Sequence, residues 1–187
     1  MLFEIFGILY KTMGCKKMKK NKEDIVYWML VDRGQWRMYI AATTEGLCYV
    51  GSQNASFERL SAWVKKELPT YVLLEDKHVL KPYRTELIDY LEGQRKQFTF
   101  PIDLQGTPFQ QSVWKVLQEI PYGETVSYTY IAEQIQKPNA VRAVGTAIGA
   151  NPVLITVPCH RVVAKSGKLT GYRGGLKMKE QLLGLEK

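Results

Sequence analysis

The chain has 187 residues, 45% of them hydrophobic and 24% charged, which excludes an intrinsically disordered protein and allows one large domain or two small ones. Its formal net charge is +8, from 26 basic and 18 acidic residues, and this gives weak support to an anionic partner such as DNA, RNA or a membrane surface. The three cysteines, Cys15, Cys48 and Cys159, have no paired spacing, so we expect no disulfide framework, reduced thiols and a cytoplasmic protein.

Residues 1–22 are expected to form an N-terminal tail or extension. The apolar stretch Met1–Tyr10 precedes a cluster of lysines, whereas a secretory signal has its positive charges first. The stretch is also too short to span a bilayer, so no membrane anchor is expected. In an alternative interpretation Met18 is the true initiator, and N-terminal sequencing of the native protein that found Met1 would exclude it.

Residues 23–100 have the pattern of a small α/β domain. Gly34 and the pair Glu45-Gly46 separate three β-like runs, which predicts an antiparallel meander with hairpin turns. The strands are expected at Ile25–Val31, Trp36–Ala42 and Leu47–Val50.

Two amphipathic helices follow these strands. The first is predicted from Phe57 to Leu68, with Ser56 as its cap. The second is predicted from Tyr83 to Leu91 and is ended by Gly93. Their aromatic and aliphatic stripes are interpreted as core, and no chemistry is assigned to them.

Residues 101–187 are expected to form a mostly helical C-terminal domain. A connector, Gln94–Gly106, leads into it and carries a predicted short strand at Phe98–Leu104. Apolar residues then recur at helical spacing three times. The helices are expected at Phe109–Ile120, Tyr128–Gln136 and Val141–Gly149.

The last two of these helices are joined by Lys137-Pro138-Asn139 and resemble a helix-turn-helix. Such a turn also joins helices in proteins that bind no DNA. Arg142 favours DNA binding, because it places a long cation at the start of the second helix. The small residues Ala140, Ala143 and Gly145 would let that helix approach a duplex closely.

The segment from Asn151 to Val163 contains the sequence's best candidate for chemistry, Cys159 followed by His160. A thiol reacts as its thiolate, so a nucleophilic cysteine needs a base or a positive charge nearby, and His160 and Arg161 are candidates. The apolar, β-branched run before Cys159 predicts an extended segment. Adjacent side chains would then point to opposite faces, so His160 need not touch Cys159 directly and could act through a bridging water. The alternative is a small buried cysteine without a role, as is assumed for Cys48.

The sequence from Pro158 to Val163 resembles the active-site signature of the O6-alkylguanine-DNA alkyltransferases. Further motifs agree in order and spacing, and they are dense from about Gly106 to Glu186: Gly106–Gln110, Val113-Trp114, Ile120–Gly123, Ser127-Tyr128, Arg142–Gly145, Asn151-Pro152, Gly171–Gly175 and Lys179-Glu180. The resemblance implies a ribonuclease-H-like α/β N-terminal domain, a small antiparallel sheet plus helices. It also implies a helical C-terminal domain with a helix-turn-helix.

The resemblance also implies catalytic roles. Cys159 would accept the alkyl group, and His160 would be the water-mediated base. Glu186 would orient His160, with Glu180 as a weaker substitute because Glu186 is the penultimate residue. Asn151 would brace the turn before the cysteine. Tyr128 would donate to the guanine ring and crowd the flanking phosphate.

For DNA binding, the resemblance implies that the recognition helix lies in the minor groove. Arg142 would fill the space left by a flipped base, with Ala140, Ala143 and Gly145 close to the backbone. Three residues would form the substrate pocket: Val162 through its carbonyl, Tyr172 against the alkyl group and Arg173 through its main-chain N–H.

The implied reaction is irreversible and stoichiometric, acts on O6-alkylguanine and O4-alkylthymine in double-stranded DNA, and needs no cofactor. Some relatives hold zinc in the N-terminal region. This chain offers there only Cys15, Cys48 and His78, so no metal is expected, and the protein is expected to be a monomer.

Three other functions compete with alkyl transfer. A module that recognises lesions without repairing them would lack the cysteine that is present here. A thiol hydrolase would leave the DNA-binding elements unexplained and has no recognisable oxyanion hole. A transcriptional regulator would leave Cys159 and His160 without a role.

Overall fold

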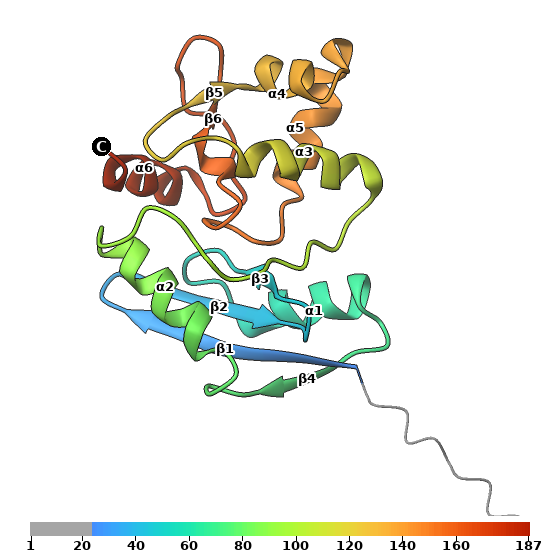
Figure 1. Cartoon of the computed structure of the whole chain (residues 1–187), viewed down its shortest axis with the longest axis vertical. Coiled ribbons are helices and arrows are strands. Elements are labelled where there is room, and N and C mark those ends of the chain that lie inside the picture. The colour runs from blue at the N-terminus through green and yellow to red at the C-terminus, as the bar shows by residue number, and fades with distance from the viewer. Residues whose placement is uncertain (1–23) are drawn as a thin grey trace, which may run out of the picture.

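Four strands form one sheet in the order β3-β2-β1-β4, at the bottom of the computed structural model in Figure 1, which describes residues 24–187. The strands are β1 (Ile25–Arg33), β2 (Trp36–Ala42), β3 (Leu47–Val50) and β4 (Val72–Glu75). The predicted meander β1-β2-β3 is antiparallel, as expected. The tail assigned to residues 1–22, with Cys15 and Met18, lies outside the described residues.

The expectation of a purely antiparallel sheet is wrong, because β4 pairs with β1 in parallel. The helix α1 (Phe57–Glu67) connects β3 to β4 and brings the chain back along the sheet, so β4 runs in the same direction as β3. Because β1 and β3 are both antiparallel to β2, β4 is also parallel to β1. The strand β4 was not predicted from the sequence, and it is four residues long and lies at the sheet edge. Ser56 is at the N-cap position of α1, but its side chain makes no capping hydrogen bond.

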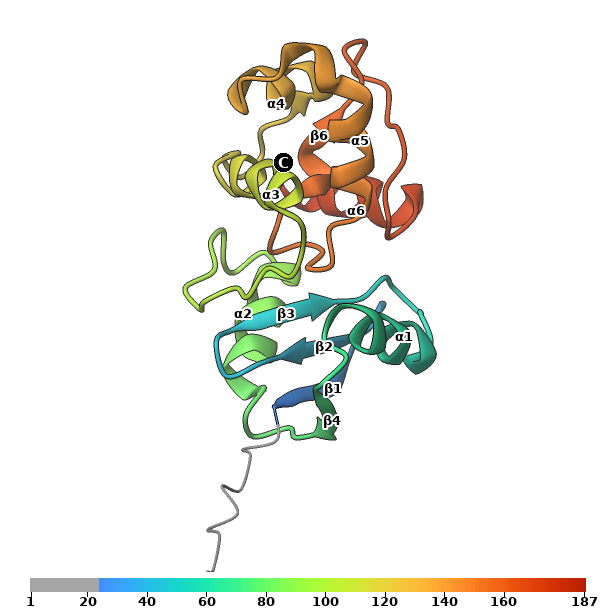
Figure 2. The same cartoon turned by 90° about the vertical axis from the view of Figure 1, so that its right-hand side faces the viewer.

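Alternate residues of the sheet face two different cores. Val26, Ala41 and Cys48 pack with α1 on one face. Met29, Met38 and neighbouring residues pack on the other face with α2 (Lys81–Leu91) and with the C-terminal half. Figures 1 and 2 show α1 and α2 on opposite sides of the sheet. The two-residue period of the strands therefore divides the apolar side chains between the cores.

The C-terminal half is mostly helical, as predicted. Its elements are α3 (Pro108–Gln118), β5 (Val126–Ser127), α4 (Tyr128–Gln134), the 3-10 turn η1 (Pro138–Ala140), α5 (Val141–Gly149), the 3-10 turn η2 (Cys159–Arg161), β6 (Val162–Val163) and α6 (Leu176–Leu185). The short strands β5 and β6 pair in parallel. A capping box between Thr107 and Gln110 starts α3, and the Ser127 hydroxyl accepts a bond from the Tyr130 N–H at the start of α4. Both helices begin close to where the sequence predicted.

Two predicted extended segments are not strands. Phe98–Leu104 forms only an isolated bridge between Ile102 and Leu47. The run before Cys159 is a series of tight turns, since the Thr156 N–H donates to the Leu154 carbonyl and the Cys159 N–H to the Val157 carbonyl. Proline at 152 and 158 removes two of the N–H groups that a strand would need.

The edge strand β3 joins the two halves. The Leu47 N–H donates to the Pro101 carbonyl at 3.0 Å, and the Val50 N–H donates to the Pro152 carbonyl at 3.0 Å. The Leu154 N–H returns a bond to the Val50 carbonyl at 3.3 Å. The loop that leads to Cys159 is thus held by the sheet of the N-terminal half. Within residues 24–187, no helix has the length and apolar character needed to cross a membrane.

Trp114 anchors the helical half, because its buried ring donates a hydrogen bond from Nε1 to the Ala147 carbonyl of α5 at 2.8 Å. We expect Trp114→Phe to lower the free energy of unfolding by about 2 kcal/mol, from the lost bond and the space left by the smaller ring. Urea denaturation measures this change. Trp63→Phe, at a half-buried position in the other core, is the matched control, and an equal loss there would contradict the expectation.

Candidate active site

Cys159 begins the turn η2 and is only 2% exposed. The Asn151 amide donates from Nδ2 to the Cys159 Sγ at 3.1 Å and to the Val157 carbonyl at 3.0 Å, and its Oδ1 accepts from the Val153 N–H at 2.9 Å. The fully buried side chain of Asn151 therefore binds the backbone at both ends of the segment from Val153 to Val157 and also contacts the sulfur.

The backbone before Cys159 is under local strain. Ile155 has φ of 71°, a left-handed conformation that a β-branched residue rarely adopts. The bond from the Thr156 N–H to the Leu154 carbonyl makes Ile155 the centre of a γ-turn. Such a conformation costs about 1–3 kcal/mol, so surrounding contacts must hold it, and the bonds of Asn151 are among them.

Burial raises the pKa of Cys159 to about 11. The hydrogen bond from Asn151 and the positive charges of Lys179 and Arg173 act in the opposite direction but do not outweigh burial. Arg161 was considered in the sequence analysis as a source of positive charge for the thiol, but its guanidinium is bonded elsewhere. At neutral pH the sulfur is therefore a thiol, and it could act as a nucleophile only if a base removed its proton.

His160 and Glu186 form a buried pair. The His160 Nε2 lies 2.6 Å from the Glu186 Oε1, and burial lowers the pKa of His160 although Glu186 raises it. The imidazole is therefore neutral at physiological pH. Because Glu186 is a carboxylate, Nε2 donates to it, and the lone pair is left on Nδ1. Nδ1 is buried and has no hydrogen-bond partner within residues 24–187.

Glu186 is firmly held although it is the penultimate residue. It is 4% exposed and accepts bonds at Oε2 from the Arg161 Nε at 2.9 Å and the Gly123 N–H at 3.1 Å. Burial alone would raise the pKa of Glu186, but the hydrogen bonds from His160, Arg161 and Tyr90 lower it to about 2. The concern that the chain end frays does not apply here. Glu180, the weaker candidate, is exposed.

No role was predicted from the sequence for Tyr90 or Lys179, and the pairing of Arg161 with Glu186 was not predicted. Lys179 is fully buried, and its Nζ donates to the carbonyls of Val162 at 2.5 Å and Thr170 at 3.0 Å. The sequence offered one signal for it, because Lys179 lies between Met178 and Leu182 on the buried face of α6. A lysine at that position must find partners for its ammonium.

The loop after β6 places the predicted pocket residues. The Tyr172 ring lies edge-on to His160 with centroids 6.4 Å apart, and its hydroxyl is buried without a partner among the described residues. The Arg173 side chain donates to the Asn151 carbonyl at 2.6 Å and lies over the Tyr49 ring at 5.3 Å. Val162 is buried, and its carbonyl is taken by Lys179.

The helix-turn-helix residues lie on α4 and α5. The Tyr128 hydroxyl is 3.0 Å from the Thr170 Oγ1, and a Cβ on Gly145 would lie 3.8 Å from the Tyr128 ring. Arg142 and Ala143 are exposed, while Ala140 is half-buried. Val144, Ala147 and Ile148 form the inner face of α5, so Arg142 points to solvent.

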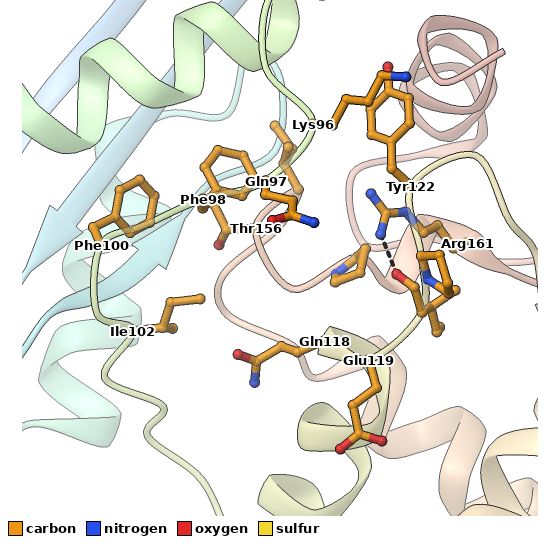
Figure 3. Close-up of a pocket in the computed structure, with 14 residues that line it drawn as sticks. Lys96, Gln97, Phe98, Phe100, Ile102, Gln118, Glu119, Tyr122, Thr156 and Arg161 are labelled. Atoms are coloured by element: carbon orange, nitrogen blue, oxygen red, sulfur yellow. Dashed lines mark hydrogen bonds between the residues drawn. The ribbon is translucent and has the colours of Figure 1, made fainter.

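Behind the network lies a cavity of about 550 Å³ (Figure 3). Phe98, Phe100, Tyr122, Thr156 and Arg161 are among its lining residues, and Cys159 is not. The Arg161 side chain lies at one side of it (Figure 3), and its Nη1 donates to the Ile120 carbonyl at 2.5 Å. Within residues 24–187, no group of three or more His, Cys, Asp or Glu side chains is arranged to hold a metal.

Comparison with known families matches almost the whole described chain. The model of the "6-O-methylguanine DNA methyltransferase, DNA binding domain" matches residues 108–187, and that of the "ribonuclease-like domain" of the same proteins matches residues 26–104. The expected ribonuclease-like N-terminal domain and helical C-terminal domain are thus confirmed, apart from the mixed sheet.

Curated relatives of the chain are proteins of the same family. An inducible methylated-DNA–protein-cysteine methyltransferase of Bacillus subtilis is 57% identical over 170 residues, covering 91% of this chain and 94% of the relative. One from Methanosarcina acetivorans is 40% identical and covers 86% of this chain and 98% of the relative. The solved structure of Mycobacterium tuberculosis OGT in complex with DNA has a TM-score of 0.71 at 38% identity, covering 86% of this chain and 92% of that chain.

The raised pKa of Cys159 can be tested with iodoacetamide. The rate of alkylation of Cys159 should rise about tenfold per pH unit from neutral pH toward the pKa of about 11, because only the thiolate attacks. Peptide mass spectrometry separates Cys159 from Cys48, and circular dichroism checks the fold at each pH. In guanidinium the same cysteine should titrate near its ordinary value of about 8.5. A rate that already levels off near neutral pH in the folded protein would contradict the assignment.

Proposed function

This chain belongs to the 6-O-methylguanine DNA methyltransferase family, and on that premise we propose that it repairs O6-alkylguanine in double-stranded DNA by taking the alkyl group onto Cys159. One observation supports this most strongly. The buried Cys159 is followed directly in the sequence by a neutral His160, whose Nε2 is fixed by Glu186 and whose Nδ1 is left unbonded among the described residues. Such a series of nucleophile, base and orienting carboxylate is suited to activating the thiol only when a substrate is present.

In the proposed reaction His160 removes the proton of Cys159 through a bridging water. The Cys159 Sγ attacks the alkyl carbon, a C–S bond forms, and the bond between that carbon and O6 breaks. The electron pair stays on the guanine, where Tyr128 donates a hydrogen bond or a proton as negative charge develops. Asn151 keeps the sulfur in place throughout, since its amide already contacts the Sγ at 3.1 Å.

The product is a thioether, from which the cysteine thiolate is a poor leaving group, so there is no simple route back to a free cysteine. We infer that each molecule acts once and that the reaction is irreversible, stoichiometric and independent of a cofactor. An O4-alkylthymine presents the same kind of alkyl–oxygen bond and is proposed as a second substrate.

DNA binding is assigned to α4 and α5. The exposed Arg142 would enter the duplex from the minor groove and fill the space left when the damaged base flips out. Ala140, Ala143 and Gly145 give this surface little side-chain bulk, which allows close approach to the backbone. The net charge of +8 would attract the phosphates without regard to sequence.

The pocket for the flipped base is assigned to Val162, Tyr172 and Arg173. The unpartnered hydroxyl of Tyr172 and its ring beside His160 support a position next to the alkyl group. A main-chain N–H of Arg173 would donate to O6, and the Val162 carbonyl would accept from the guanine amine. The contact of Lys179 with that carbonyl leaves one of its two lone pairs free for this.

We further propose that the chain divides into an extension at residues 1–22, an α/β domain at 23–100 and a DNA-binding, alkyl-accepting domain at 101–187. A monomer is sufficient for the chemistry, because every assigned residue comes from one chain. Free thiols at Cys48 and Cys159 favour the reducing cytoplasm.

Transfer itself is tested by mass spectrometry. The purified protein is mixed with a short duplex that contains O6-methylguanine, and the intact and peptide masses are then taken. We expect one methyl group per molecule, on the peptide that contains Cys159. Cys48→Ala should be methylated and Cys159→Ala should not. An unchanged mass while the duplex still binds would identify a lesion-recognition protein and exclude the proposed reaction.

The proposed role of Arg142 predicts that its removal slows transfer from a duplex but not transfer from a free base. We expect Arg142→Ala to slow repair of the duplex by about tenfold or more, because flipping costs a few kcal/mol that the arginine would offset. Transfer from the free base O6-benzylguanine should keep its rate, since no base is flipped. Lys77→Ala removes an equal charge from an exposed position in the N-terminal half and is the control. Equal slowing of both substrates by Arg142→Ala would place its effect in the active site instead.

A further inference from the structure

The carboxylate of Glu186 is bound by a residue from the other half of the chain. The Tyr90 hydroxyl, on α2, donates to the Glu186 Oε1 across 96 positions of sequence. The same oxygen is bonded to the His160 Nε2 and to the Arg161 Nη2, the latter at 3.2 Å. Tyr90 is fully buried, with its ring against Phe98.

We propose that Tyr90 is a positioning residue for alkyl transfer: its phenol fixes the carboxylate that orients His160, so that both halves of the chain build the catalytic machinery. The inference rests on the proposed function, because the reaction whose rate it affects is the transfer to Cys159. Nothing in the sequence motifs around Cys159 indicates a contribution from α2.

Packing alone does not account for a tyrosine at this position. The ring lies in an aromatic cluster with Phe98 and Tyr122, with centroids 5.0 and 5.9 Å away, and phenylalanine would satisfy those contacts. A buried hydroxyl is costly unless it is bonded, and here it is bonded to the one carboxylate that holds the base. The hydroxyl also lies 3.5 Å from the Arg161 Nη2 and so contacts both charges of the pair.

The geometry explains how the phenol would act on His160. The Glu186 Oε2 is held by the Arg161 Nε and the Gly123 N–H. Oε1 is held toward His160 by the imidazole itself, by the Tyr90 hydroxyl and, at longer distance, by the Arg161 Nη2. Without the phenol, the carboxylate has one fewer restraint on its rotation, and the ring it orients becomes less well placed.

The charge on Oε1 is also shared between Tyr90 and His160. Burial and the neighbouring Glu186 raise the pKa of Tyr90, so the phenol stays protonated and donates at every physiological pH. The other ionisable groups that face His160 or Glu186 are Arg161 from η2, Tyr122 after α3, Lys179 from α6 and Tyr172 from the loop after β6. Without the phenol, the negative charge on the Glu186 Oε1 would be less neutralised and would stabilise the protonated imidazole more strongly, which would raise the pKa of His160.

The test is the rate of a single turnover with an O6-methylguanine duplex, measured from about pH 5 to about pH 9. We expect Tyr90→Phe to lower the maximal rate about tenfold and to move the acidic half-maximum of the profile to higher pH. Tyr83→Phe is the matched control, because Tyr83 lies on the same helix with its ring against Phe100. It should follow the wild-type profile.

A second variant covers the case in which Tyr90→Phe folds poorly. Difluorotyrosine at position 90 keeps the ring and donates a stronger hydrogen bond, so the acidic half-maximum should move to lower pH. Profiles equal to wild type for both substitutions would overturn the inference. A wild-type protein that transfers no methyl group would instead overturn the proposed function, so the two failures are distinct. Titration of the His160 ring by NMR would then still measure whether Tyr90 acts on it.

Discussion

The buried carboxylate of Glu186 is the interaction on which the site depends. It accepts bonds from His160 and Arg161 of η2, from the backbone of Gly123 and from Tyr90 of α2. A buried charge is tolerated only when it is paired and hydrogen-bonded, and removing one partner leaves the other uncompensated. If the segment that carries Glu186 separated from the protein, the buried guanidinium of Arg161 would lose its carboxylate partner. This explains why a penultimate residue is ordered within the core.

The Cys159 side chain is a protonated, unreactive thiol in the structure. Burial keeps Cys159 protonated, and Asn151 holds its sulfur without deprotonating it. A resting thiolate would be open to oxidation and to unselective alkylation, and burial prevents both. In the proposed reaction the base that activates this thiol is His160, whose own neutrality is a result of the same burial. One physical cause thus sets the protonation state of both the nucleophile and its base.

Local signals in the sequence predicted more of the fold than of the site. The starts of α3 and α4 follow from Thr107 and Ser127, whose side chains cap the helices from adjacent positions. The turns before Cys159 were not predictable from an apolar run, because they depend on the side chain of Asn151 and on a strained Ile155. Tyr90 was interpreted only as part of a core helix, since its partner lies at the far end of the chain. Contacts of that kind have no local pattern.

The pairing of β3 with the loop at 152–154 has a consequence for the order in which the chain is completed during synthesis. On the outer edge of β3, the backbone groups of Leu47 have no partner until Pro101 and Asp103 are made, and those of Val50 have none until Pro152 and Leu154 are made. The Tyr90 hydroxyl has its partner only after Glu186 has been synthesised. The first half of a nascent chain would thus present an open sheet edge, a feature that promotes misassembly. The C-terminal half therefore closes that edge when it folds, and the same half supplies the residues of the candidate site.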